Sequence, residues 1–296
     1  MSEGDVRQWQ GTTDGTSWMH HSLIGMMKVI PLWFFYLLMV LAVPFYMIFN
    51  HKGYLSIYHY FRGRQGFGPL KAFLHTCADH FMFGAVIMDR FASYAGKRFR
   101  VETSQAAMYK ELCASPKGFV QISSHIGNDE LAGYELKAKK RINALVFGEE
   151  GKTLMENRSR VLGENNIRLV SISEDMSHLV ILNNALADGE IVNIHGDRVF
   201  GSNRTVSCNI LGGKAELPMG PFLMAAMRDV PVMSVFVMKI GLRKYRVHLF
   251  RPDERLEGLG VREKAEALAK AYAENITCIL RRYPDQWFNY YEFWND

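Results

Sequence analysis

The stretch FVQISSHIGNDELAG, residues 119–133, decides how the chain is expected to fold. A run of apolar, β-prone residues ends in two serines, a histidine follows, and a helical pattern begins near Asp129. Open α/β sheets form their sites at the carboxyl ends of strands, so chemistry is expected in a polar turn that directly follows an apolar strand. The stretch therefore predicts a strand, a turn that carries His125, and a helix.

Strand-like and helix-like segments alternate from residue 101 onward. The strand-like segments are apolar and rich in branched residues, and helical periodicity separates several of them. The expected strands are 118–123, 142–147, 167–172, 190–195, 205–210, 230–238 and 244–250. The expected helices are 68–92, 129–140, 152–163, 175–187, 219–228 and 261–282. Such alternation predicts an α/β fold in which a mixed, mostly parallel sheet is flanked by helices.

An uncharged run, VIPLWFFYLLMVLAVPFYMIF at residues 29–49, precedes this pattern. It is long enough to cross the hydrocarbon core of a bilayer as a helix. Pro31 and Pro44 each remove a backbone donor, so we expect a helix that is kinked or only partly embedded. More basic residues follow the run than precede it, which predicts that the remainder lies in the cytoplasm. We divide the chain into a membrane-anchoring segment, 1–60, and a folded domain, 61–296. The alternative is a buried core helix of a soluble protein.

The composition excludes several classes of protein. Of the 296 residues, 48% are hydrophobic and 22% are charged, which is typical of a folded globular chain. A formal net charge of +5 is too small to indicate a nucleic-acid-binding protein, and it is compatible with an anionic membrane surface or an acidic substrate. The four cysteines are scattered without a CxxC pair, which favours a reducing compartment over a disulfide framework or a zinc site.

One cluster of metal-ligand residue types has the wrong spacing for a metal site. His75, Cys77, Asp79 and His80 lie on the expected helix 68–92. Residues two or five positions apart on a helix point in different directions, so these side chains are not expected to converge. We predict no metal site here.

Two histidines have a carboxylate five residues later, and this spacing is a weak signal. His248 lies within an alternating strand pattern and Asp253 in the turn after it, which indicates an ordinary strand residue. His125 follows a fully apolar strand, and Glu130 lies at the start of the next helix. A carboxylate in this position holds one imidazole nitrogen and stabilises the imidazolium formed during proton transfer. The pattern makes His125 a candidate base and Glu130 its partner, with an ordinary turn as the alternative.

The segment FGEEGKTLM, residues 147–155, follows a strand and opens a helix as a phosphate-binding loop does. Two residues separate its glycines where the Walker pattern has four, and two glutamates would repel phosphates. Nucleotide binding is therefore not expected, although Lys152 at a helix start can face an anionic group.

The segment NIHGDRVFG, residues 193–201, is a further polar strand end. It places His195, Asp197 and Arg198 around Gly196. The segment is either a surface turn with an ion pair or a place where backbone approaches a ligand. No GxSxG elbow occurs in the chain, which argues against a serine hydrolase.

These segments together resemble the lipid A late (secondary) acyltransferases, a family within the lysophospholipid acyltransferase-like superfamily. HIGNDE matches the family's His-x4-Glu/Asp box, and GDRVFG matches its second box, an acidic residue followed by a short run to Phe-Gly. AELPMGPFLMAA and VPVMSVFV match its Pro-x-Gly-Pro helix start and the strand after it, and YPDQWFNYYEFW matches its Pro-x-Gln-Trp end. With the apolar N-terminal run, the matches keep the family's order over nearly the whole chain.

The resemblance implies an acyltransferase domain at 61–296. His125 is expected to act as general base on an acceptor hydroxyl, with Glu130 orienting it. The donor would be a thioester of acyl carrier protein or coenzyme A, used as co-substrate with no separate cofactor and no metal, and the acceptor a lipid A precursor. The residues expected to bind substrate are Asn128, Lys152, Arg158, Gly196, Asp197 and Arg198.

Three positions depart from the family pattern, and they leave the acceptor open. Arg198 follows the acid of the second box, Leu217 stands where Thr is common, and Tyr291 with Glu292 replaces a His-Arg pair. An amino-acid lipid or a polyene glycolipid is the alternative acceptor, and a non-catalytic lipid-binding protein of the same fold is the alternative class. The expected location is the cytoplasmic face of a bacterial inner membrane, with no nucleic-acid partner.

Overall fold

The computed structural model describes residues 17–131, 139–146, 159, 163, 166–173, 175–199, 204–252 and 256–295. The helices are α1 (Ser17–Val29), α2 (Leu32–Phe49), α3 (His51–His59), α4 (Pro69–Tyr94), α5 (Ala106–Ala114), α8 (Ser177–Ala187), α9 (Gly220–Arg228) and α10 (Val261–Arg282). Two short turns are the π-helical η1 (Tyr60–Arg64) and the 3-10 helical η2 (Pro284–Gln286). The strands are β1 (Arg100–Glu102), β2 (Phe119–Ser123), β3 (Ile142–Val146), β4 (Ile167–Ser171), β5 (Ile191–His195), β6 (Thr205–Ile210), β7 (Gly213–Pro218), β8 (Val232–Gly241) and β9 (Lys244–Phe250).

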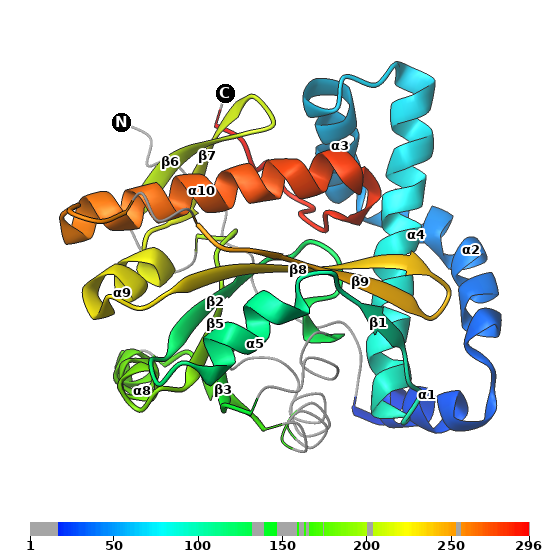
Figure 1. Ribbon diagram of the computed structural model, residues 1–296. Coiled ribbons are helices and arrows are strands. Elements are labelled where there is room, and N and C mark those ends of the chain that lie inside the picture. Colours follow the sequence, from blue (N-terminus) through cyan, green and yellow to red (C-terminus); the bar gives the residue numbers. More distant parts are fainter. Residues whose placement is uncertain are drawn as a thin grey trace.

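Seven of the strands form one sheet in the order β1-β9-β8-β2-β5-β3-β4 (Figure 1). All neighbours pair in parallel except β8 and β9, which form an antiparallel hairpin. Strands β6 and β7 form a separate antiparallel pair. The expected mixed, mostly parallel α/β sheet is confirmed, and β2 and β5 lie side by side near its centre.

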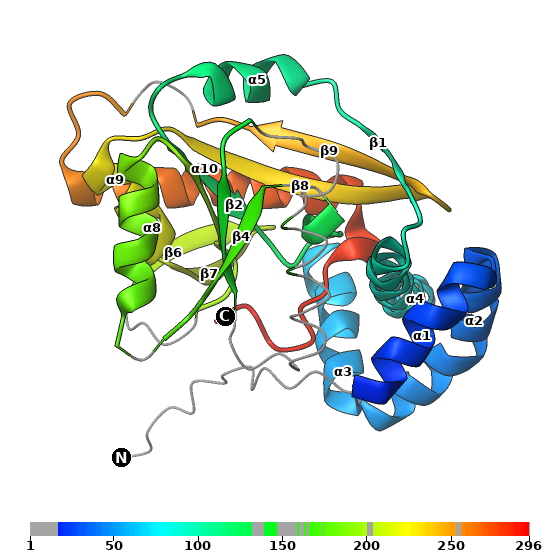
Figure 2. The ribbon, with the colours of Figure 1, turned by 90° about the horizontal axis from the view of Figure 1, so that it is seen from below.

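Helices cover both faces of the sheet because strand residues alternate between two cores. On β2, Val120 and Ile122 belong to the core that contains α8, α9, α10 and the β6–β7 pair, whereas Phe119 belongs to the core that contains α1, α2, α4 and α5. All three side chains are fully buried. Figure 2 shows that α1, α2, α3 and α4 gather at one end of the molecule. Because both faces of the sheet are covered, every residue of β2 is buried, including the polar Gln121 and Ser123.

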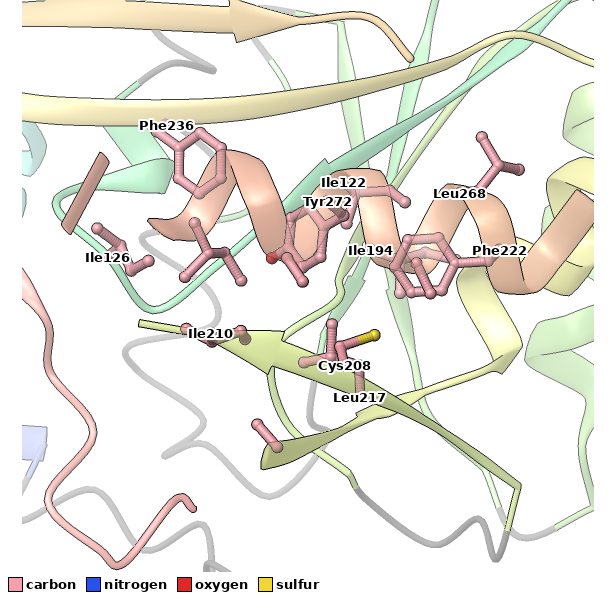
Figure 3. Close-up of a cluster of buried hydrophobic side chains, with 14 of the residues drawn as sticks. Ile122, Ile126, Ile194, Cys208, Ile210, Leu217, Phe222, Phe236, Leu268 and Tyr272 are labelled. Atoms are coloured by element: carbon pink, nitrogen blue, oxygen red, sulfur yellow. The ribbon is translucent and has the colours of Figure 1, made fainter. Parts of the chain in front are cut away.

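The core beneath α10 fixes the end of the strand that precedes His125 (Figure 3). The Tyr272 ring from α10 stacks on Phe236 of β8, with ring centroids 6.1 Å apart. Its hydroxyl donates a 2.7 Å hydrogen bond to the backbone carbonyl of Ser123, the last residue of β2. A buried tyrosine whose hydroxyl finds a partner combines apolar packing with a fixed polar contact. The carboxyl end of β2 is therefore held rigidly against α10.

Several boundaries differ from the sequence expectation. The apolar run at 29–49 is not one helix, because α1 ends at Val29 and Pro31 precedes the first residue of α2. Helix α2 is long and apolar enough to cross a membrane by length and composition, and 28% of it is buried. The sequence pattern missed α1, α3, α5, β1 and β7. Pro218, expected at a helix start, ends β7, and α9 begins at Gly220.

A buried charge cluster fastens α2 to the sheet. The Asp89 carboxylate on α4 is fully buried, and it lies 2.5 Å from the ammonium of Lys239 on β8. The hydroxyls of Tyr36 on α2 and Tyr245 on β9 both donate to the same carboxylate. A buried ion is tolerated only when it is paired and its remaining positions are hydrogen-bonded, and this cluster meets both requirements.

We expect Lys239→Ala to lower the free energy of unfolding by about 3–5 kcal/mol, because it leaves the Asp89 charge buried without its counter-ion. The matched control is Lys264→Ala, which removes the lysine of an ion pair whose acid, Asp229, is 74% exposed. That change should alter stability by about 0–1 kcal/mol. Urea denaturation of the purified protein measures both values, and equal losses would contradict the assigned role of the cluster.

Candidate active site

The pairing of β2 with β5 brings two polar strand ends together. Ser123 and His195 are register partners at the last paired position of the two strands. His125 and Asp197 each lie two residues beyond that position, so the segments after β2 and β5 stay side by side past the end of the sheet. Two residues far apart in sequence thus meet at the carboxyl end of parallel strands, where sites of α/β proteins form.

His125 and Asp197 make two hydrogen bonds. The His125 ring nitrogen Nδ1 lies 2.9 Å from Asp197 Oδ1, and the His125 backbone N–H donates to Asp197 Oδ2 at 2.7 Å. The carboxylate side chain is only 1% exposed, whereas the imidazole is 30% exposed. An ionised carboxylate only accepts, so Nδ1 carries the proton and Nε2 carries a lone pair. Nε2 makes no hydrogen bond to any residue that the structure describes.

The electrostatics keep this imidazole neutral. Burial and the nearby Arg198 charge lower the pKa of His125 to about 4, although Asp197 acts in the opposite direction. Burial alone would raise the pKa of Asp197, but the charge and hydrogen bond of His125 and the charge of Arg198 outweigh it and bring that pKa to about 2. At neutral pH the pair is a carboxylate and a neutral imidazole, the state required of a general base.

The expected pairing of His125 with Glu130 is corrected by this geometry. Residues 129–131 begin a helix, and the Glu130 carboxylate accepts a 2.5 Å hydrogen bond from the Tyr94 hydroxyl on α4. Its other oxygen lies 4.0 Å from Arg90 Nε. The first turn of the helix directs Glu130 toward α4, while β5 places Asp197 beside the imidazole. A role of Glu130 in the reaction stays a prediction.

A second histidine–carboxylate pair also joins the two strand ends, with the histidine on β5 and the carboxylate after β2. His195 Nε2, at the end of β5, lies 2.8 Å from Asp129 Oδ2, and Arg90 Nη2 lies 2.9 Å from Asp129 Oδ1. The His125 and His195 rings are neighbours, with centroids 4.6 Å apart and planes tilted by 30°. Two adjacent imidazoles disfavour a second positive charge. Sequence reasoning missed this pair, because its residues belong to different strand ends.

Two of the expected substrate-binding residues contact other parts of the protein instead of facing open space. Asn128 is fully buried, its Oδ1 accepts from Arg90 at 3.2 Å, and its Nδ2 donates to the Tyr245 hydroxyl at 3.3 Å. A Cβ added at Gly196 would lie 2.5 Å from Ile122 Cγ2, so protein core fills the space beside this glycine. Both residues shape the turn, and the structure gives neither a position facing a ligand.

Arg198 joins the His125 turn to the C-terminal segment. Its Nε donates to Asn289 Oδ1 at 3.0 Å, and Nη2 donates to the Phe288 carbonyl at 2.9 Å. The backbone N–H of Phe288 in turn donates to the His125 carbonyl at 3.1 Å. The guanidinium therefore supplies positive charge beside Asp197 and holds residues 288–289 against the catalytic candidates.

The remaining expected residues separate into two groups. Lys152 and Arg158, together with Phe200, Gly201 and Asp253, lie outside the described residues. The four residues of metal-ligand type on α4 have different surroundings. His75 lies 2.5 Å from Asp285, and His80 bonds to the Thr76 carbonyl. Asp79 accepts from Trp287 and Tyr290, and Cys77 is a free thiol. Among the described residues, no group of three such side chains is placed to hold a metal ion.

Comparison with protein families identifies the family of the chain. Residues 84–294 match the family model described as bacterial lipid A biosynthesis acyltransferase. The chain belongs to this family. The match covers His125, Asp197, Arg198 and the C-terminal segment, and it agrees with the family resemblance of the sequence. The protein is therefore an acyltransferase.

One solved structure is similar to the chain at low identity. The chain is similar to the crystal structure of the 1-acyl-sn-glycerophosphate (LPA) acyltransferase PlsC from Thermotoga maritima, with 14% identity and a TM-score of 0.34. That similarity covers 78% of this chain and 95% of the other. No curated protein matches the sequence.

Asp197→Asn tests the corrected pairing. An asparagine keeps the size of the side chain but removes the charge that fixes the His125 tautomer, so kcat should fall by about 10²–10⁴-fold. Glu130→Gln should have the smaller effect, because Glu130 bonds to Tyr94 rather than to the imidazole. Rates of acyl transfer by the purified variants give the ranking, and the reverse order would identify Glu130 as the partner.

The pH dependence of kcat/KM tests the charge state of His125. Because the depressed pKa keeps the base neutral, activity should persist below pH 6.5 and fall only as the pH drops through about 4. Arg198 lowers this pKa, so Arg198→Met should move the acid limb to higher pH. The exposed Arg228→Met is the control. An acid limb near 6.5 in the wild type would contradict the assignment.

Proposed function

We propose that this protein transfers a fatty acyl chain from a thioester of acyl carrier protein or coenzyme A to a hydroxyl of a lipid A precursor. The observation that carries the proposal is the His125–Asp197 pair, in which a buried carboxylate holds Nδ1 and leaves Nε2 as a base. Membership of the lipid A acyltransferase family supports the acceptor, and family membership together with the neutral base supports acyl transfer.

The proposed reaction uses one proton relay. Nε2 of His125 takes the proton of the acceptor hydroxyl as its oxygen attacks the thioester carbonyl. Asp197 stabilises the imidazolium that forms, as a carboxylate at Nδ1 does in other acyl-transfer enzymes. The tetrahedral intermediate then breaks its C–S bond, and the imidazolium returns the proton to the leaving thiolate. The products are an ester and a free carrier thiol, and no covalent enzyme intermediate is formed.

Membrane association is part of the proposal, and the outer face of α2 supports it. Large apolar side chains are exposed along this helix: Trp33, Phe34, Leu37, Leu38, Val40, Leu41, Phe45, Tyr46, Ile48 and Phe49. Contiguous exposed apolar surface of this kind marks a membrane or protein contact. Leu70, Phe73 and Leu74 at the start of α4 extend the exposed apolar surface of this helical end. We place the protein on the cytoplasmic face of a bacterial inner membrane.

Three basic residues are proposed to receive the anionic parts of the substrates. Arg198 contributes positive charge beside the pair while its Nε and Nη2 donate to Asn289 and Phe288. Lys152 and Arg158, which lie outside the described residues, complete the proposed set. Positive charge at these positions suits a phosphorylated donor or acceptor.

His125→Ala provides the direct test of the proposed reaction. Removing the base should lower the rate of carrier-thiol release by about 10²–10⁴-fold when thioester and a lipid A precursor are both present. His248→Ala is the matched control, because that histidine lies on β9 with its Nε2 3.1 Å from the Tyr283 hydroxyl, away from the His125 turn. Thiol release and the mass of the acylated lipid are measured together. Equal rates in wild type and His125→Ala would remove the basis of the proposal.

A further inference from the structure

The second pair, His195 with Asp129, is arranged like the His125–Asp197 pair. In each, a carboxylate holds one ring nitrogen, at 2.8 Å in the second pair and 2.9 Å in the first. The Asp129 and Asp197 side chains are 13% and 1% exposed, whereas the His195 and His125 rings are 25% and 30% exposed. Both rings are therefore more open than the carboxylates that hold them, and the proposed acyl transfer uses only one of them.

The two rings differ in which nitrogen is left for a substrate. Asp197 holds Nδ1 of His125, so Nε2 of that ring is the base. Asp129 holds Nε2 of His195, and because an ionised carboxylate only accepts, that nitrogen carries a proton. Nδ1 of His195 makes no hydrogen bond within the part of the chain that the structure describes. Nδ1 is thus the nitrogen that a substrate can contact.

The charges around the rings leave room for one added positive charge. Burial raises the pKa of the neighbouring Tyr272 and Tyr291, so both stay uncharged. Among the described residues, the charged neighbours of the two pairs come from α4 and from the turns after β2 and β5: the guanidiniums of Arg90 and Arg198, and the carboxylates of Asp129, Glu130 and Asp197.

Three negative and two positive groups favour one imidazolium, and ring centroids only 4.6 Å apart disfavour two. Burial and the Arg198 charge lower the pKa of His125, so that ring stays neutral. The one positive charge is therefore assigned to His195, beside Asp129. An imidazolium carries a proton on both nitrogens, so Nδ1 of His195 becomes a donor.

We propose that His195 is a second catalytic residue, whose Nδ1–H donates to the thioester carbonyl oxygen as that oxygen becomes an oxyanion. The inference rests on the proposed function, in which a hydroxyl attacks a thioester. The attacking oxygen, which bonds to Nε2 of His125, and the oxyanion are substituents of one tetrahedral carbon, so two neighbouring rings are close enough to serve both. A donor placed where charge develops contributes about 10²–10³-fold to the rate.

The charges balance through the proposed step. Nε2 of His125 takes the acceptor proton as the acceptor oxygen bonds to the carbonyl carbon, and the carbonyl π electrons move to the carbonyl oxygen. The new positive charge on His125 is matched by the new negative charge of the oxyanion, which separates it from the charge of His195. The carbonyl then re-forms as the C–S bond breaks, and His125 gives its proton to the thiolate. His195 keeps its proton throughout.

Two amide substitutions separate the two nitrogens of His195. The amide group of asparagine is bonded at Cγ, as Nδ1 of histidine is, whereas the amide nitrogen of glutamine lies near the position of Nε2. His195→Asn therefore keeps a donor for the oxyanion and loses the bond to Asp129, while His195→Gln keeps that bond and loses the donor. His248→Asn and His248→Gln are the matched controls, because His248 bonds to the Tyr283 hydroxyl on β9, away from the site.

The experiment measures thiol release from acyl carrier protein and coenzyme A thioesters by the full-length protein, with a bacterial lipid extract as acceptor. Thermal unfolding checks that each variant is folded. His195→Gln should lower kcat by about 10²–10³-fold. His195→Asn should lower it only about tenfold, as for loss of one orienting hydrogen bond.

The pH profile gives a second readout. Activity of the wild type should fall as the pH rises and His195 loses its proton, and this basic limb should be absent in His195→Asn, because an amide does not titrate. A purely structural His195 would produce neither the difference between the amides nor the loss of the limb.

The outcomes separate this inference from the proposed function. A reversed or equal ranking of the two His195 variants, or a basic limb that persists in His195→Asn, overturns the inference even when His125→Ala is inactive. The expected ranking with loss of the limb supports it, even when mass spectrometry shows that the acylated lipid is not a lipid A precursor.

Discussion

The site depends on the parallel register of β2 against β5. Ser123 faces His195 in that register, and the residues two positions on, His125 and Asp197, are bonded twice. Side chains alternate along a strand, so a slip of one residue would turn one partner toward the opposite face. The two bonds also satisfy a carboxylate that would otherwise be buried without donors. Sheet pairing and the charge of Asp197 therefore stabilise each other.

Much of the fold was predictable from sequence because its signals are local. Apolar runs such as 119–123 and 191–195 identified buried strands, and helical spacing identified α10. His125 was also recognised as a candidate, since it follows an apolar run. Its partner was not, because the five-residue spacing to Glu130 is visible in sequence whereas the pairing of β2 with β5 is not. Both strand ends were recognised separately, and only their adjacency was missing.

The buried polar contacts were beyond sequence reasoning for a similar reason. Asp89 and Lys239 are 150 residues apart, and nothing near either residue shows that they form a pair. Gly196 was recognised as a position of close approach, but the approaching atoms belong to Ile122 and Tyr272 rather than to a ligand. Composition identifies such residues as unusual, and only tertiary packing identifies what they contact.

The Pro-x-Gln-Trp segment shows how a short motif holds distant parts in one arrangement. Gln286 is buried, and its amide bonds to both the backbone N–H and the carbonyl of Lys239, at 2.8 and 2.9 Å. The next residue, Trp287, donates its N–H to Asp79 on α4 and pairs with Ile126 of the histidine turn. Each contact uses backbone or a buried side chain. Because α4 also carries the Asp89 cluster that fastens α2, the apolar helical end and the His125–Asp197 pair are fixed relative to each other. The end that we propose to contact lipid is therefore held at a set distance from the imidazole, which suits attack on a positioned thioester.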